Sequence, residues 1–296
     1  MRKIHPTGDA LNFALTLRRY QAFGEDAANR FDGAVFRKAF FVDKKLCLLS
    51  LFEKEKHAQM AVSPATRAQK VQREAERIAH KILGLEFPLA EFYDFAQKDA
   101  VLRELTIRFC GLRPTLAADL FEILITSISA QQINLQFAFA VRSRLVRRYG
   151  EKLQHNGETY FAFPTPEKLA RARVASLRAL QFTEKKSEYI IGLARAICDG
   201  RLDLQHLPNL SDDDIAAQLL PLHGIGRWTV DWLLARGLGR GNAIAAGDLG
   251  VRKAVQRFYF NDEPQSEDTI RNFAQRWGIF TNLAVHYLLT GMALGS

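Results

Sequence analysis

The chain has 296 residues, of which 48% are hydrophobic and 25% charged, so it can bury a sizeable core in two or three subdomains. Its 41 Lys and Arg against 32 Asp and Glu give a formal net charge of +9, compatible with an ordinary basic protein or with a polyanionic partner such as DNA, RNA or an anionic membrane surface. The three cysteines lie far apart and form no CxxC pair, which argues against a zinc site, an iron–sulfur cluster or a disulfide framework.

The first hundred residues predict a small antiparallel sheet covered by a helix. Strands are expected over residues 11–17, 34–42, 46–52 and 57–63, with a turn at 43–45. Residues 66–83 carry apolar side chains at helical spacing opposite a charged face, which predicts an amphipathic helix packed on that sheet. We expect residues 1–98 to form this α+β subdomain.

From about residue 92 onward the pattern is one helix after another. Two helices are expected within 116–149, one begins at Thr165 or Pro166, and others cover 184–199, 211–220, 227–238, 249–258 and 266–277. The predicted fold class is therefore α+β, with the small antiparallel-sheet subdomain followed by a mostly α-helical region over 99–296.

A short turn with two glycines, residues 222–226, separates two of these helices. Gly224 and Gly226 allow positive φ and close backbone approach. Their N–H groups, at the start of a helix, can form an anion site that positions a phosphate without reading bases. The alternative is a plain corner between helices in which glycine is only a cap, and on two glycines alone that alternative is favoured.

The longer pattern changes this judgement. The segments LHGIGRWT and AAGDLG resemble those of the helix–hairpin–helix (HhH-GPD) DNA glycosylases, and most of all the bacterial 3-methyladenine DNA glycosylase II, or alkylbase DNA glycosylase, group. The stretches 120–150, with SISAQQIN, and 177–190 match this superfamily as well. The resemblance covers residues 92–293. It implies a hairpin at 220–228 and an active-site cleft between helical subdomains.

Asp248 matches the catalytic aspartate of that superfamily. A carboxylate beside the sugar can stabilise an oxocarbenium-like transition state and orient water. One carboxylate can suffice for an alkylated purine, because the cationic base leaves easily. The alternative is that Asp248 caps the helix that follows it, and both roles can hold together.

The base pocket is expected to contain Trp228, Trp232 and Leu249. Superfamily members that also cut the DNA backbone carry a lysine at the position of Trp228, so the resemblance implies hydrolysis without a Schiff base. The two tryptophans lie one helical turn apart and could stack on a flipped cationic base. Leu249 stands where some relatives have an aromatic residue. Packing in the core is the alternative, about even for Trp232.

The remaining predicted site residues would contact DNA. By resemblance Gln132, next to Gln131, would fill the gap left by the flipped nucleotide; a solvated loop is the alternative. The expected backbone contacts are His223, Gly224, Gly226, Arg227, Lys185 and Lys186. Arg142 and three neighbouring arginines are spread around a helix and are interpreted as a solvated face.

These residues predict a monofunctional glycosylase that flips alkylated purines out of double-stranded DNA and hydrolyses the N-glycosidic bond. The alternatives are a glycosylase for oxidised, deaminated or mismatched bases and a non-catalytic lesion-binding protein. No organic cofactor is expected; a Na⁺ or K⁺ ion could bind the carbonyls of Leu220, Leu222 and Ile225. The chain start has no apolar secretion signal and no segment approaches the roughly 18 apolar residues of a membrane span. A cytoplasmic monomer without membrane contact is expected, associated with the nucleoid in a prokaryote.

Overall fold

The N-terminal part of the chain is an antiparallel sheet. A computed structural model describes residues 2–4 and 10–295, so part of the chain start, on which the expectation of no secretion signal rests, lies outside the described residues. The sheet has the order β1-β5-β4-β3-β2. Its strands are β1 (Arg2–Lys3), β2 (Arg30–Phe31), β3 (Val35–Val42), β4 (Lys45–Lys54) and β5 (His57–Ser63). The predicted strands 34–42, 46–52 and 57–63 are thus confirmed.

The central strands of this sheet are buried on both faces. On one face Phe36 and Leu49 pack against the apolar side of helix α3 (Gln69–Leu83). On the other, Ala39 and Leu48 pack against Tyr160 from a second, two-stranded sheet, β6 (Lys152–His155) and β7 (Glu158–Phe161). Because two faces are covered, β4 is apolar from Leu46 to Phe52 except at Ser50, and β3 is apolar except at Arg37 and Lys38.

Two features near the sheet differ from the prediction. Residues 11–17 alternate like a strand but form helix α1 (Phe13–Leu17), which Asn12 caps by accepting the N–H of Leu15 at 3.0 Å. The hairpin of β6 and β7 was not predicted, because each strand has only four residues. Its signal was the Asn156-Gly157 turn, with φ of 50° and 80°.

The rest of the chain is helical, which confirms the predicted fold class. The helices around the first core are α6 (Leu120–Ala130), α7 (Leu135–Tyr149), α8 (Pro166–Ala170), α9 (Val174–Arg178), α10 (Glu184–Cys198), η1 (Leu207–Asn209), α11 (Asp212–Leu219), α12 (Arg227–Trp232) and the π-helix η2 (Leu233–Leu238). Those around the second core are α4 (Leu89–Ala96), α5 (Ala100–Arg108), α13 (Leu249–Tyr259), α14 (Glu267–Ala274), η3 (Gln275–Phe280) and α15 (Thr281–Leu294). The short helix α2 (Arg19–Ala22) follows α1.

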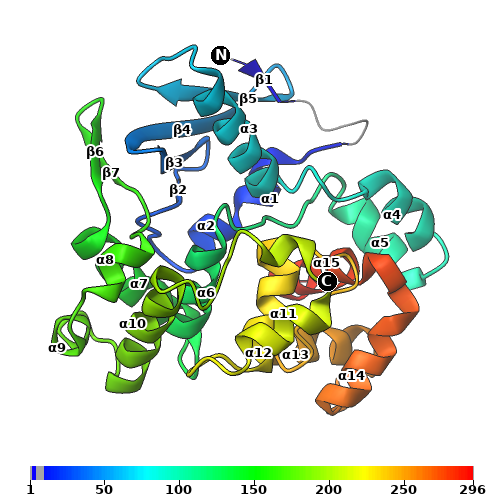
Figure 1. Ribbon diagram of the computed structural model, residues 1–296. Coiled ribbons are helices and arrows are strands. Elements are labelled where there is room, and N and C mark those ends of the chain that lie inside the picture. The colour runs from blue at the N-terminus through cyan, green and yellow to red at the C-terminus, as the bar shows by residue number, and fades with distance from the viewer. Residues whose placement is uncertain (1, 5–9, 296) are drawn as a thin grey trace.

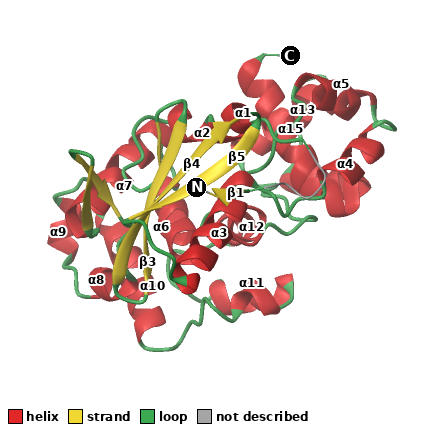
Figure 2. Cartoon of the chain, turned by 90° about the horizontal axis from the view of Figure 1, so that it is seen from above, coloured by secondary structure: helices red, strands yellow, loops and turns green. Residues whose placement is uncertain are grey.

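The two helical cores are built from different parts of the chain. Figure 1 shows α5, which with α4 follows the sheet in sequence, beside α15 from the end of the chain. Helices α6 to α12 form the other core between them in sequence. Seen from above, the strands gather on the side of the first core, away from α4 and α5 (Figure 2). The chain therefore crosses between the two cores twice, between α5 and α6 and again at η2 and the loop that leads to α13.

A buried ionic network joins the sheet to the first core. Lys38 of β3 pairs with Glu122 of α6 at 2.7 Å, and Arg142 of α7 pairs with Glu122 at 2.6 Å and with Asp26 at 2.5 Å. Asn29 also donates to Glu122 at 2.7 Å. Burial raises the pKa of Glu122, but Lys38 and Arg142 outweigh it, so the pKa lies below its usual value. The sequence pattern indicated a solvated face for Arg142, but the side chain is buried. One of its partners, Asp26, lies over a hundred residues away in the sequence.

Among the described residues, no helix is both long and apolar enough to span a lipid bilayer.

Candidate active site

Asp248 lies at the start of α13 and uses both carboxylate oxygens. Its Oδ1 accepts the backbone N–H groups of Gly250 at 2.8 Å and Val251 at 3.1 Å, so it is the N-cap of the helix. Its Oδ2 accepts the indole N–H of Trp228 at 2.9 Å and of Trp232 at 3.3 Å. The side chain remains half-buried. Four donors therefore fix the orientation of one partly accessible carboxylate, and hydrogen bonds to a charged acceptor are the strong kind.

The two tryptophans meet Asp248 through their edges. Their rings are 6.5 Å apart between centroids and inclined by 74°, an edge-to-face arrangement. Sequence reasoning placed both at a base pocket and missed their hydrogen bonds to the carboxylate. The spacing from Trp228 to Asp248 gives no signal for such a contact, because a loop of unpredictable course lies between them.

Trp232 lies where the two helical cores meet and packs against both. Directly after it the predicted helix 227–238 widens into the π-helix η2, and π-helical turns are rare and common at functional sites. The buried Asn282 donates to the carbonyls of Ala235 at 2.8 Å and Arg240 at 2.9 Å, so an α15 side chain completes the end of this helix. Arg236 of η2 lies over the Trp232 ring, 5.6 Å from its centroid.

Arg236 is a buried cation next to the site. It donates to Asn282 Oδ1, and its Nη2 is 3.4 Å from Nδ1 of His286. Burial, aided by Arg19, lowers its pKa to about 9. The pKa of His286 is also lowered well below its usual value by burial and by Arg236, so this histidine is neutral near pH 7.

The glycine turn lies between α11 and α12, as predicted, but its two glycines differ. Gly224 has φ of +87°, and a side chain there would overlap the ring of Tyr189 on α10. Gly226 has φ of −113° and is the N-cap of α12, with no atom of the described residues within 4 Å of an added Cβ. The expectation of positive φ therefore holds only for Gly224. Gly226 instead presents its backbone to open space at a helix N-terminus, where anions are favoured.

The loop between α6 and α7 reaches this turn. Gln131 donates from Nε2 to the carbonyl of Gly224 at 2.9 Å, so its amide connects the two segments. Gln132 is exposed and adopts φ of +56°, an uncommon conformation for a residue other than glycine. The structure thus separates the two glutamines, one tied to the turn and one directed to solvent.

The residues predicted as basic contacts to DNA differ in their exposure to solvent. Lys186 is only 9% exposed, and its Nζ donates to the carbonyl of Ser129 at 2.9 Å. Burial lowers the pKa of this lysine. Its expected role as a surface contact is wrong, because the ammonium group binds the end of α6 instead. Lys185, His223 and Arg227 are exposed, as a contact to a large ligand requires.

Leu249 and the carbonyls proposed for a monovalent cation remain predictions. The Leu249 side chain is 59% exposed beside Asp248, so it lies at the surface of the site and not in its interior. In the turn, the Leu222 carbonyl already accepts the N–H of Ile225 at 3.0 Å. No group of three or more His, Cys, Asp or Glu side chains in the described part of the chain could hold a metal ion.

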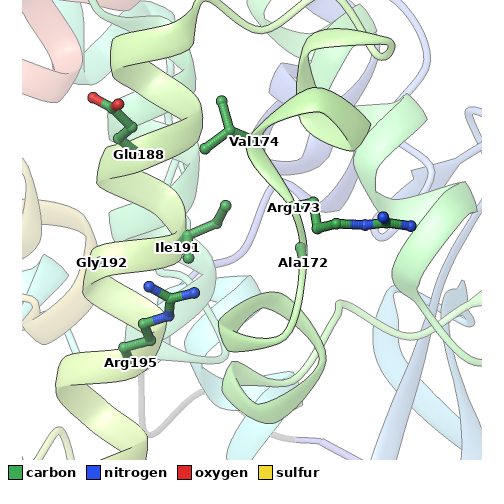
Figure 3. Close-up of a pocket in the computed structure, with 7 residues that line it drawn as sticks. All are labelled: Ala172, Arg173, Val174, Glu188, Ile191, Gly192 and Arg195. Atoms are coloured by element: carbon green, nitrogen blue, oxygen red, sulfur yellow. The ribbon is translucent and has the colours of Figure 1, made fainter.

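A surface pocket of about 300 Å³ lies elsewhere, between α10 and the segment that joins α8 to α9 (Figure 3). Ile191 and Val174 face its interior, whereas Glu188 and Arg173 point outward (Figure 3). None of its lining residues belongs to the glycine turn or to the Asp248 segment. It is therefore separate from the candidate active site.

Comparisons with known proteins find family matches for most of this chain. Residues 125–278 match the HhH-GPD superfamily of base excision DNA repair proteins, and residues 7–124 match the N-terminal domain of 8-oxoguanine DNA glycosylase. A DNA-3-methyladenine glycosylase of Bacillus subtilis (strain 168) is 32% identical over 215 residues, which cover 73% of this chain and 71% of that protein.

Solved structures are similar over nearly the whole chain. A 3-methyladenine DNA-glycosylase from Archaeoglobus fulgidus has a TM-score of 0.90 at 29% identity and covers 100% of this chain and 99% of its own. MBOgg1, in complex with a low affinity DNA ligand, has a TM-score of 0.80 at 20% identity and covers 98% and 95% of the two chains. At that identity the second likeness concerns the fold.

Proposed function

Because this chain belongs to the HhH-GPD superfamily of base excision DNA repair proteins, we propose that it is a monofunctional DNA glycosylase that releases alkylated purines, of the 3-methyladenine and 7-methylguanine type, from duplex DNA. The family is the one that the sequence motifs predicted. The observation that carries the proposal is the Asp248 carboxylate, which four donors hold in one orientation and which is still partly open to solvent.

DNA would be held at the glycine turn and the adjoining loop. The N–H groups at Gly226 and the N-terminus of α12 would bind a backbone phosphate, with Arg227, Lys185 and His223 at the same surface. The exposed Gln132 would enter the base stack where the damaged nucleotide is flipped out, because its side chain is open to solvent beside the glycine turn that Gln131 binds. The proposed occupants of the site are thus one phosphate and one flipped nucleotide.

The chemical step would use a single carboxylate. The bond between C1′ and the base nitrogen breaks, and its electron pair neutralises the cationic alkylated purine, which leaves. The negative charge of Asp248 stabilises the oxocarbenium-like sugar that develops. Water then adds its hydroxyl to C1′, and its proton passes to Asp248 or to solvent. Trp228 stands where a lyase would need an amine, and an indole nitrogen cannot form a Schiff base.

Removal of oxidised bases is the second candidate, because the first 124 residues match an N-terminal domain described for 8-oxoguanine DNA glycosylase. We favour alkylated bases, because the relative at 32% identity bears the 3-methyladenine name. We also propose that the protein is a monomer. A duplex DNA substrate would place it with the chromosome, which in a prokaryote lies in the cytoplasm.

A panel of duplexes that each carry one lesion tests the proposal. We expect release of 3-methyladenine and 7-methylguanine, intact DNA strands after mild neutral work-up, and no covalent adduct on borohydride treatment. Release of 8-oxoguanine alone, or a borohydride-trapped adduct, would contradict it. Release of 8-oxoguanine alone would mean that the substrate is an oxidised base. A trapped adduct would mean that the mechanism passes through a Schiff base.

A further inference from the structure

Asp231 is a buried carboxylate that the proposed chemistry does not use. It lies on the inner side of α12, and its side chain is 3% exposed. Its Oδ1 accepts Nε of Arg227 at 2.9 Å, and its Oδ2 accepts Nη2 of Arg271 on α14 at 2.8 Å. Burying a carboxylate is costly unless it is paired, so this placement requires both arginines.

One partner of Asp231 belongs to the DNA-binding surface proposed above. Arg227 is the first residue of α12, directly after the cap residue Gly226. Its side chain is 53% exposed, so a phosphate can approach it while Nε stays bound to Asp231.

The other partner reaches the loop that carries Asp248. Arg271 donates to the carbonyl of Ile244 at 3.4 Å and pairs with Glu267 at 2.8 Å. Burial lowers the pKa of Arg271, but its hydrogen bonds to Asp231 and Glu267 raise it above the usual value. This guanidinium therefore remains charged and can bridge α12, α14 and the loop.

Glu267 in turn packs on the residue before Asp248. A side chain at Gly247 would place its first carbon 2.8 Å from Oε2 of Glu267, so this carboxylate lies directly against the glycine. The turn is closed by the N–H of Asp248, which donates to the carbonyl of Ala245 at 2.9 Å. The network consequently binds the loop just before this turn, at the Ile244 carbonyl, and lies against the turn itself at Gly247.

We propose that Asp231 is a positioning residue that connects the phosphate-binding turn to the catalytic loop through Arg271 and Glu267. The inference rests on the proposed function for the identity of the two surfaces it joins. Asp231 does not touch DNA or the reacting sugar. It holds the Asp248 carboxylate in position while Arg227 binds a phosphate. We refer to Arg227, Asp231, Glu267 and Arg271 as the Asp231 network.

Asp231→Asn tests this inference, because it keeps the shape and removes the charge. Asp268→Asn is the matched control: it removes the same charge from an exposed position of α14 outside the network. Hydrogen exchange gives a readout that needs no DNA. The amides of Gly250 and Val251 are bound by Asp248, so they should exchange faster in Asp231→Asn, while amides of β3 and β4 and the control variant stay unchanged.

The kinetic readout should separate positioning from binding. At saturating enzyme, Asp231→Asn should release base roughly 10- to 100-fold more slowly, because small displacements of a catalytic group cost about that much. The Kd for the duplex should change by less than about threefold, because Arg227 keeps its charge. Arg271→Lys, which keeps a cation but cannot bridge as many acceptors, should give the same signature in a milder form.

Two results would overturn the inference. One is that the amides of Gly250 and Val251 exchange no faster in Asp231→Asn than in the control variant. The other is that the amides of β3 and β4 in Asp231→Asn exchange faster by as much as those of Gly250 and Val251, which would mean general destabilisation. If Asp231→Asn does not fold, Arg271→Lys decides by the same criteria. If the native protein releases no alkylated base, the proposed function fails, whereas the exchange result still decides whether Asp231 positions Asp248.

Discussion

At the scale of single residues, Asp248 is the N-cap of α13, as one interpretation of its sequence context predicted, and its catalytic role stays a proposal. One oxygen caps α13, and the other accepts two indole N–H groups. Capping fixes the backbone of the residue, and the indoles fix the second oxygen. The carboxylate is thus oriented before any substrate binds, which is the form of electrostatic stabilisation that costs no rearrangement during the reaction.

Replacing Trp228 by Phe tests the orienting role of the indole. The change keeps an aromatic ring but removes the donor 2.9 Å from Asp248 Oδ2. A hydrogen bond to a charged group contributes about 1.5–3 kcal/mol, so single-turnover base release should slow by roughly 10- to 100-fold. Trp277→Phe makes the same substitution in the buried second core and should leave the rate unchanged. Equal rates for Trp228→Phe and the native protein would show that the indole N–H has no orienting role.

Some residues of the site could be predicted and others could not, for physical reasons. Trp228 and Asp248 lie in two short segments, LHGIGRWT and AAGDLG, that carry the family resemblance. Lys186 and Gln131 looked equally suited to DNA, yet their donors bind the carbonyls of Ser129 and Gly224. Those acceptors belong to other elements of the fold, so charge and sequence position alone do not reveal them. Asp231 left one local signal, its i,i+4 spacing from Arg227.

At the scale of elements, the glycine turn is held in place by its neighbours. Gln131 binds its carbonyl, and Tyr189 lies against the face of Gly224 where a side chain would be. The same Tyr189 ring meets His223 edge-on, with centroids 5.0 Å apart. The turn is therefore a rigid part of the first core, as a phosphate-binding element needs to be.

The two glycines of the turn should respond differently to alanine. Gly224→Ala adds a strained φ and an overlap with Tyr189, so unfolding free energy should fall by roughly 2–5 kcal/mol. Gly226→Ala meets open space at a favourable φ, so stability should fall by no more than about 1 kcal/mol while DNA binding weakens. Thermal melts and duplex binding by anisotropy measure both effects. Equal melting temperatures for the two variants would contradict this account of the turn.

Periodicity predicted most helices and strands, but it failed where local and tertiary effects compete. Residues 11–17 alternate like a strand, but Asn12 caps a helical turn whose Phe13 and Leu17 reach the sheet core. The helix widens after Trp232, where Asn282 of α15 binds the carbonyl of Ala235. A single helical pattern cannot contain the effect of a side chain fifty residues away.

At the scale of the whole molecule, the two helical cores meet at the candidate site, and the sheet is joined to the first of them elsewhere. Trp232 packs on both helical cores, and Glu122 and Arg142 join the first of them to the sheet. These junctions consist of residues distant in sequence, so composition and periodicity predicted the class of each part but not their assembly. The family resemblance supplied the expectation of a site between helical subdomains, which stays a prediction.

The central claim is that Asp248 drives release of an alkylated base from duplex DNA. The most direct test compares native protein with Asp248→Asn on one duplex that carries 7-methylguanine, with single-turnover base release and duplex Kd measured on the same preparations. The account predicts that the variant, whose amide can still accept the N–H groups of α13, binds the duplex within about threefold of native but releases base at least roughly 100-fold more slowly. Base release by Asp248→Asn at the native rate, or none from the native protein, would contradict it.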